Sequence, residues 1–212
     1  MRLSIFVGSL AGFCYLLAYA DYNRGIFSGR IKPNGATWGI WSMIAVLSAG
    51  SYFTVSGDFW KSILQIVNIL PCIGTFLLAL FAGKFQKLGL TDWLASLITV
   101  LAVGVWAICK SAAWTNVIVQ GAIVIGFIPI WRSVWTAPSL EHRRPWVLWT
   151  ISYSLAAAVV VLRWNGQWID LVSPLNCIVL HASVPVLCSL RASVDEPPEG
   201  NKPSVLDASA PA

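Results

Sequence analysis

The second half of the chain repeats the first. An ungapped shift of 108 positions places Asn176 on Asn68 and Arg132 on Arg24. The same shift aligns three pairs of tryptophans: Trp38 with Trp146, Trp41 with Trp149, and Trp60 with Trp168. The sequence therefore predicts a duplicated unit, over residues 1–83 and again over residues 113–191. Any fold proposed for this chain has to accommodate that repeat.

The composition predicts an integral membrane protein. Hydrophobic residues make up 57% of the chain and charged residues only 11%, too few to cover a water-soluble globule. A helix needs about 20 residues to cross a hydrocarbon layer about 30 Å thick. The apolar stretches near this length are 3–20, 36–56, 60–82, 92–109, 115–132, 146–163 and 168–190. The predicted fold class is therefore all-α, with seven transmembrane helices.

The repeat and the helix number together predict a topology. Each repeat holds three helices, so two repeats joined directly would point in opposite directions across the membrane. The linking helix within residues 84–112 makes them parallel, in a three plus one plus three arrangement with an axis along the membrane normal. Residues 192–212, rich in Pro, Glu, Ser and Ala, are predicted to form a disordered cytosolic tail.

The basic residues divide unevenly between the two sides of this predicted bundle. Four lie on the N-terminal side and ten on the other. The four are Arg2, Lys61, Lys110 and Arg163, and the ten are Arg24, Arg30, Lys32, Lys84, Lys87, Arg132, Arg143, Arg144, Arg191 and Lys202. The positive-inside rule then predicts an external N-terminus and a cytosolic C-terminus in a plasma (inner) membrane. The bases form no stripe of the kind that binds nucleic acid.

Residues 1–20 leave a second interpretation open. Arg2, an apolar run and Ala18-Tyr19-Ala20 before Asp21 imitate a cleavable signal peptide. Cleavage would remove the counterpart of the helix at 115–132 and break the duplication. A retained first helix is therefore the preferred prediction.

The order of residues along each repeat resembles that of the SWEET and PQ-loop family of small-solute transporters. In that family, a proline near the cytosolic end of a repeat's first helix precedes a basic loop, a tryptophan opening the second helix and an asparagine in the third. Pro129, Arg132, Trp149 and Asn176 follow this order. In the first copy the matching residues are Arg24, Trp41 and Asn68.

This resemblance covers residues 3 to about 190, and it also has departures. The family often has Gln after the proline, whereas Ile130 follows Pro129, and Asp21 stands at the matching place in the first copy. The resemblance implies a seven-helix transporter that moves a sugar-like solute by alternating access.

Asn68 and Asn176 are the leading candidate binding residues. A buried amide offers two donors and two acceptor lone pairs, which suit the hydroxyl groups of a neutral polar solute. The resemblance implies the same, because these positions match the asparagines that line the family's central cavity. An alternative is that each amide only bonds to a neighbouring helix.

Three further residues complete the predicted binding site. Gln65 and Ser173 each lie one helical turn before one of the asparagines and could supply further hydrogen bonds. Tyr52 lies sixteen residues before Asn68, where the family carries an aromatic residue that stacks on the solute. Val160 occupies the matching place in the second copy, so the aromatic wall would be one-sided.

The repeated tryptophans suggest anchoring at the membrane interfaces, and a proline suggests a hinge within a helix. The six repeated tryptophans are predicted to form aromatic belts at the membrane interfaces, with a gate role for Trp41 or Trp149 as the alternative. Pro129 removes a backbone donor inside a helix and could act as a hinge. The other reading of Pro129 is a tolerated irregularity.

Few ionisable groups fall within the apolar runs. The aspartates lie near helix ends, and His181, about 140° round the helix from Asn176, is expected to face away from the site. Without a buried carboxylate to carry protons or sodium, passive uniport is the expected mechanism.

The sequence argues against an enzyme. HExxH, GxSxG and paired buried carboxylates are absent from it, and the five cysteines show no metal-ligand spacing, so neither metal nor cofactor is predicted. The competing hypothesis is a seven-helix scaffold or receptor that holds a cytosolic partner. Whether the chain forms a homo-oligomer stays open.

Overall fold

The computed structural model describes residues 1–212 except 32, 34, 83–88, 137–141 and 196–212. The described residues form seven helices that are long and apolar enough to cross a membrane, which confirms the all-α prediction. The helices are α1 (Arg2–Phe27), α2 (Gly35–Ser56), α3 (Ile63–Ala82), α4 (Leu90–Cys109), α5 (Ala112–Thr136), α6 (Arg143–Leu162) and α7 (Ile169–Asp195).

Several helices run beyond the apolar stretches that predict them. α1 continues past residue 20 to Phe27, and α5 continues past residue 132 to Thr136. Arg24 and Arg132 lie near these C-terminal ends, where a positive charge interacts favourably with the helix dipole. α7 continues to Asp195, so residues 192–195 extend a helix, and the remainder of the predicted tail lies outside the described residues.

Within each group of three helices on either side of α4, the contacts between helices follow the same pattern. α3 packs on both α1 and α2, and α7 packs on both α5 and α6. Within the described residues, α1 does not contact α2 and α5 does not contact α6. The two groups meet where α1 packs on α6 and where α2 packs on α5. The space between them is therefore bounded by all six helices.

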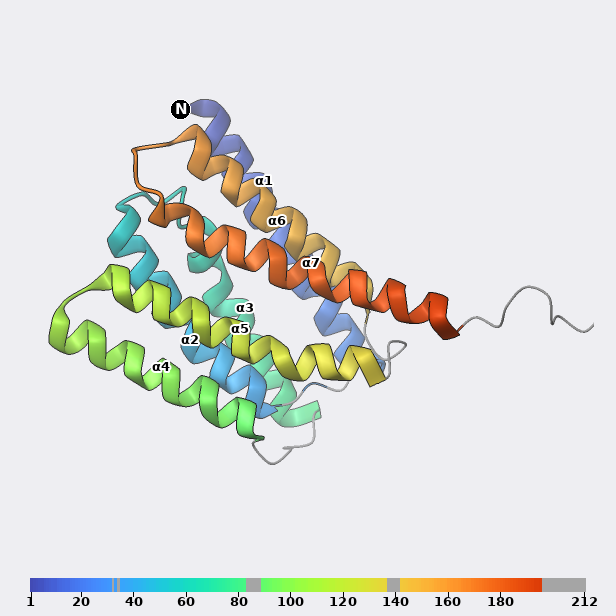
Figure 1. The fold of residues 1–212 in the computed structure, drawn as a ribbon. Coiled ribbons are helices and arrows are strands. Elements are labelled where there is room, and N and C mark those ends of the chain that lie inside the picture. The colour runs from blue at the N-terminus through green and yellow to red at the C-terminus, as the bar shows by residue number, and fades with distance from the viewer. Residues whose placement is uncertain (32, 34, 83–88, 137–141, 196–212) are drawn as a thin grey trace, which may run out of the picture.

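α4 lies at the edge of the bundle, as Figure 1 shows. It packs mainly on α5 and less extensively on α2. It ends at Lys110, whose φ of 53° is left-handed, and this reversal turns the chain directly into α5. The peripheral position leaves the space between the other six helices free of α4.

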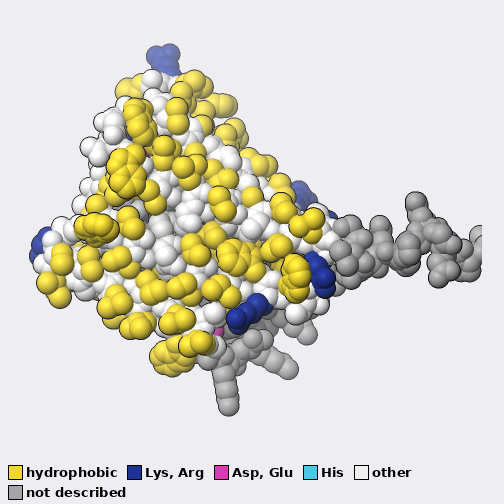
Figure 2. All heavy atoms as spheres, viewed as in Figure 1, with side chains coloured by type: hydrophobic (Ala, Val, Ile, Leu, Met, Phe, Trp, Pro, Cys, Tyr) yellow, Lys and Arg dark blue, Asp and Glu magenta, His cyan; other side chains and the backbone are white. Residues whose placement is uncertain are grey.

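The surface is largely apolar, unlike that of a water-soluble protein, and the mainly apolar interior also holds polar side chains. Hydrophobic side chains are spread across the whole face in Figure 2, and Lys and Arg side chains lie at its edges. Large side chains such as Phe6, Leu70 and Phe81 are exposed. Several serine and threonine side chains are buried, and some of them bond a carbonyl in the preceding turn. This distribution suits a lipid environment.

Candidate functional site

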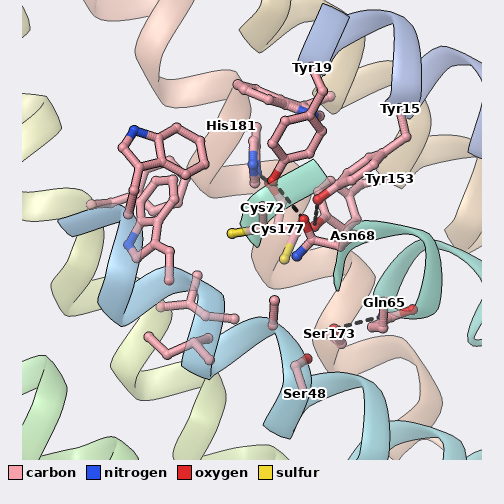
Figure 3. A pocket seen from close by; sticks show the side chains of 17 residues that line it. Tyr15, Tyr19, Ser48, Gln65, Asn68, Cys72, Tyr153, Ser173, Cys177 and His181 are labelled. Carbon is pink, nitrogen blue, oxygen red and sulfur yellow. Dashed lines mark hydrogen bonds between the residues drawn. The ribbon is translucent and has the colours of Figure 1, made fainter. Parts of the chain in front are cut away.

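A cavity of about 70 Å³ lies between the two helix groups. Figure 3 shows it from close by. The side chains that line it come from α1, α2, α3, α5, α6 and α7: Tyr15, Tyr19, Trp38, Trp41, Ile44, Ala45, Ser48, Gln65, Asn68, Cys72, Ile123, Phe127, Trp149, Tyr153, Ser173, Cys177 and His181. No Asp, Glu, Lys or Arg is among these lining residues.

The two central helices each present one face to the cavity. Gln65 and Asn68 of α3 lie one turn apart, as do Ser173 and Cys177 of α7. The Gln65 amide nitrogen donates to the Ser173 hydroxyl across 3.1 Å, which joins α3 to α7 at one end of the cavity. The Gln65 carbonyl oxygen has no hydrogen-bond partner among the described residues. The structure thus brings together three of the predicted binding residues: Asn68, Gln65 and Ser173.

Tyrosines supply hydroxyl groups from the opposite wall. The Tyr19 hydroxyl donates to Oδ1 of Asn68 across 2.7 Å, which orients this amide. The hydroxyls of Tyr15 and Tyr153 lie 3.1 Å apart and link α1 to α6. These residues were missed in the sequence, although Tyr15, Tyr19 and Tyr22 recur at helical spacing and mark one face of α1.

The predicted belt of tryptophans is wrong at three positions. Trp38, Trp146 and Trp149 are almost completely buried, with exposures of 5%, 2% and 2%. Their rings pack edge-to-face or tilted against Tyr19, Tyr22 and one another. This packing favours the bundle interior because it gains aromatic contacts that lipid does not provide. Trp168, 69% exposed, does lie on the surface.

The position of the Trp41 ring depends on a glycine in the neighbouring helix. A Cβ atom added to Gly126 of α5 would lie 2.6 Å from the Trp41 indole nitrogen, closer than packing permits. The missing side chain allows Trp41 to lie against α5, where its ring stacks on Phe127 at a centroid distance of 5.5 Å. Gly126 therefore sets the position of Trp41 in the cavity wall.

His181 faces the cavity, so the expectation that it points elsewhere is wrong. Its ring is within 6 Å of the rings of Phe127, Trp149 and Tyr153. Nδ1 lies 2.7 Å from the carbonyl oxygen of Cys177, and because a carbonyl only accepts, Nδ1 carries the proton. The expectation failed because it assumed that Asn176 faces the cavity.

Asn176 and two other predicted residues lie outside the lining. The Asn176 amide donates to the side-chain and main-chain oxygens of Gln120 in α5, at 3.0 and 3.3 Å. Tyr52 is fully buried near the end of α2, and its hydroxyl donates to the carbonyl oxygen of Asp170 across 2.6 Å. Pro129 lies inside α5. Trp41 and Trp149, the candidate gates, do line the cavity.

A buried ion pair lies one turn beyond Gln65 and Ser173. Nζ of Lys61 is 2.6 Å from Oδ2 of Asp170, and these side chains are 1% and 0% exposed. The expectation that the chain has no buried carboxylate is therefore wrong. Asp170 stands at the start of α7, a position typical of the surface, but Tyr52 of α2 and Lys61, in the turn before α3, bond to it and it is buried.

A second ion pair joins loops at the same end of the bundle. Nε of Arg163 lies 2.5 Å from Oδ2 of Asp58, in the loop between α2 and α3. Partial burial alone would raise the pKa of Asp58, but the Arg163 hydrogen bond and the backbone N–H groups of Lys61 and Trp60 lower it below its usual value. Asp58 therefore stays ionised at neutral pH.

Among the described residues, no group of three or more His, Cys, Asp or Glu side chains could hold a metal ion. Comparison of the chain with models of protein families, with curated proteins and with solved structures finds no match. The fold and the cavity themselves define the class. The described residues form an α-helical membrane protein with seven candidate spans and a cavity between two helix groups, lined by aromatic, aliphatic and uncharged polar side chains.

Proposed function

We propose that this protein is a membrane transporter that moves a small neutral polar, sugar-like solute by alternating access. The observation that carries the proposal is the cavity itself, which lies between two helix groups and is lined by uncharged hydrogen-bonding and aromatic side chains. A scaffold has no need for such a cavity, because helix association favours close contact.

The chemistry of the lining supports a neutral solute. Asn68, Gln65 and Ser173 offer donors and acceptors, and the tyrosine hydroxyls add more. A charged solute would find no lining Asp, Glu, Lys or Arg to compensate its lost hydration. Aromatic rings offer flat faces to the apolar side of a sugar ring.

The size of the cavity supports a contracted state. Its free space of about 70 Å³ is enough for several water molecules, since each needs about 10–15 Å³ measured in this way. Binding sites for small molecules are usually larger, about 300 Å³ or more. A solute the size of a sugar therefore enters only when the helix groups separate.

Buried side chains at the two ends of the cavity are candidates for the two gates. At one end, the Lys61–Asp170 pair joins the beginnings of α3 and α7. Toward the other end, Tyr19, Trp38 and Trp149 form a buried aromatic cluster between α1, α2 and α6. Breaking one set of contacts while keeping the other would expose the cavity to one side at a time.

We infer that α1–α3 and α5–α7 are parallel repeats that rock against each other. Support comes from the shift of 108 positions and from the matching contacts of the two helix groups. Pro129 in α5 is a candidate hinge. The order of Pro129, Arg132, Trp149 and Asn176 supports a divergent membership of the SWEET and PQ-loop superfamily.

Passive uniport is the mechanism we favour. The buried carboxylate of Asp170 is held by Lys61, so it is not a free proton or sodium acceptor. The four-to-ten division of basic residues supports an external N-terminus and a cytosolic C-terminus in the plasma (inner) membrane.

The test is uptake of labelled sugars, amino acids and nucleosides by proteoliposomes that contain the purified protein. Empty liposomes supply the background. The proposal expects saturable uptake of at least one neutral polar solute that unlabelled solute inhibits. Folded protein that transports none of the three classes would favour the scaffold hypothesis instead.

A further inference from the structure

A groove separate from the central cavity lies between the C-terminal half of α5 and the neighbouring turns of α7. Its volume is about 370 Å³. Apolar and aromatic side chains dominate its lining, which consists of Ile128, Trp131, Arg132, Trp135, Thr136 and Leu187. The Trp131 indole nitrogen donates to the Ser183 hydroxyl across 2.6 Å, which fixes this ring between the helices. The groove is therefore a defined part of the α5–α7 interface, held in shape by this hydrogen bond.

Two guanidinium groups border the groove. Arg132 lines it and is exposed, and no ion pair to Arg132 occurs within the described part of the chain. The Arg191 guanidinium lies 4.8 Å from the centre of the Trp135 ring, and its Nε donates to the Trp135 carbonyl oxygen across 3.1 Å. These contacts hold Arg191 beside the groove through its Nε and the face of its guanidinium, and within the described residues no acceptor is recorded for its terminal nitrogens.

The groove lies at the depth where lipid headgroups are expected. Arg132 and Trp135 belong to the last turns of a 25-residue helix, and Trp135 is 55% exposed. Tryptophan and arginine at a helix end are typical of the membrane interface. Figure 2 shows Lys and Arg side chains beside apolar ones close to where the described part of α7 ends.

We propose that this groove binds an anionic phospholipid. Arg132 and Arg191 contact the headgroup phosphate, and an acyl chain lies along Ile128 and Leu187. Arginine suits phosphate because its planar fork makes paired hydrogen bonds. A soluble anion would leave the apolar floor uncovered, whereas a phospholipid satisfies both the charge and the apolar surface. The site does not depend on the transport proposed above.

An arginine in the first repeat provides a matched control for this proposal. By the shift of 108 positions, Arg24 at the end of α1 matches Arg132, but Gly83 stands in place of Arg191 and Asn23 in place of Trp131. Arg24 is an exposed arginine near a helix end, like Arg132. It lacks the second guanidinium and the indole that complete the groove.

The experiment is native mass spectrometry of the purified full chain in a neutral detergent. Phosphatidylglycerol and phosphatidylcholine with the same acyl chains are titrated separately, and glycerol phosphate is added as a competitor. We expect the protein to retain phosphatidylglycerol more strongly. Replacing one arginine by glutamine should weaken this binding about fivefold, and Arg132→Gln/Arg191→Gln about 25-fold. Arg24→Gln should change it by less than about twofold, because Arg24 lies outside the groove.

Equal retention of the two lipids would overturn the proposal, and so would an Arg24→Gln effect as large as that of the double variant. Complete displacement of the lipid by glycerol phosphate would also overturn it, because this result would indicate a site for soluble anions. If the double glutamine variant fails to fold, Arg132→Lys/Arg191→Lys keeps the charge. This variant should still prefer phosphatidylglycerol, and loss of that preference in folded protein would contradict a charge-based site.

Discussion

Lys61 and Asp170 form an ion pair of 2.6 Å whose two side chains are almost completely buried. The pair joins the turn before α3 to the first turn of α7, and Tyr52 of α2 donates to the Asp170 carbonyl oxygen. Three helices are thus held together at one end of the central cavity. A buried pair of this kind is stable only while both charges are present.

Replacing one partner of this pair should destabilise the protein strongly. Asp170→Asn leaves the Lys61 ammonium buried without a counter-charge, at an expected cost of about 3–5 kcal/mol in the free energy of unfolding. Denaturant unfolding in detergent, followed by tryptophan fluorescence, measures this cost. Lys61→Met/Asp170→Leu removes both charges and should recover most of it.

Asp58→Asn is the matched control for this prediction. The side chains of the Arg163–Asp58 pair are 24% and 19% exposed, against 1% and 0% for Lys61 and Asp170, so breaking it should cost less. If Asp170→Asn costs no more than Asp58→Asn, the Lys61–Asp170 pair does not hold this end of the bundle together.

The two repeated asparagines should differ in their effect on solute binding. Asn68 lines the cavity, whereas Asn176 bonds to Gln120 outside it. Asn68→Ala should weaken binding of the transported solute by about 1–3 kcal/mol. Asn176→Ala should change solute affinity little and act mainly on stability. Isothermal titration with the solute found in the uptake screen distinguishes them, and equal losses of affinity would show that Asn176 also reaches the solute.

Replacing Gly126 by alanine should destabilise the protein. The Cβ of Gly126→Ala would lie 2.6 Å from the Trp41 indole nitrogen, so the ring has to move. Such overpacking typically costs about 1–3 kcal/mol, and displacement of Trp41 should also reduce transport. In Gly121→Ala the new Cβ meets no atom within 4 Å, and alanine favours a helix. The melting temperature should fall for the first variant and not for the second.

The sequence predicts the helices well because apolar length alone defines a membrane span. All seven were expected, and the differences lie at their ends, where polar residues such as Asp21 continue a helix. The rotation of each helix is harder to predict, because a span is apolar on both its lipid-facing and its packed sides. Cys177 and His181 face the cavity while Asn176 does not, and hydropathy does not separate these faces.

The candidate site is therefore only partly predictable. Asn68, Gln65 and Ser173 were identified because hydrogen-bonding side chains stand out in an apolar run. The burial of Trp38, Trp146 and Asp170 was missed for a common reason. Tryptophan and aspartate near a helix end are typical of the membrane interface, and only the packing of neighbouring helices brings them inside.

The termini are predicted to lie on opposite sides of the membrane. In a variant without native cysteines, a cysteine at position 205 should react with an impermeant thiol reagent only from the cytosolic side. A cysteine placed before Ser4 should react only from outside. Labelling of intact and of broken cells separates the two cases. Reaction of both positions from the same side would indicate a cleaved first segment or a wrong number of spans.

The most direct test of the transport proposal is solute exchange by proteoliposomes, measured with and without a proton gradient. We expect saturable exchange of a neutral polar solute at the same rate in both conditions, and a large loss of exchange in Asn68→Ala at solute concentrations below saturation. Exchange that stops when the gradient is dissipated, together with normal exchange by Asn68→Ala, would contradict both the passive mechanism and the assignment of the site.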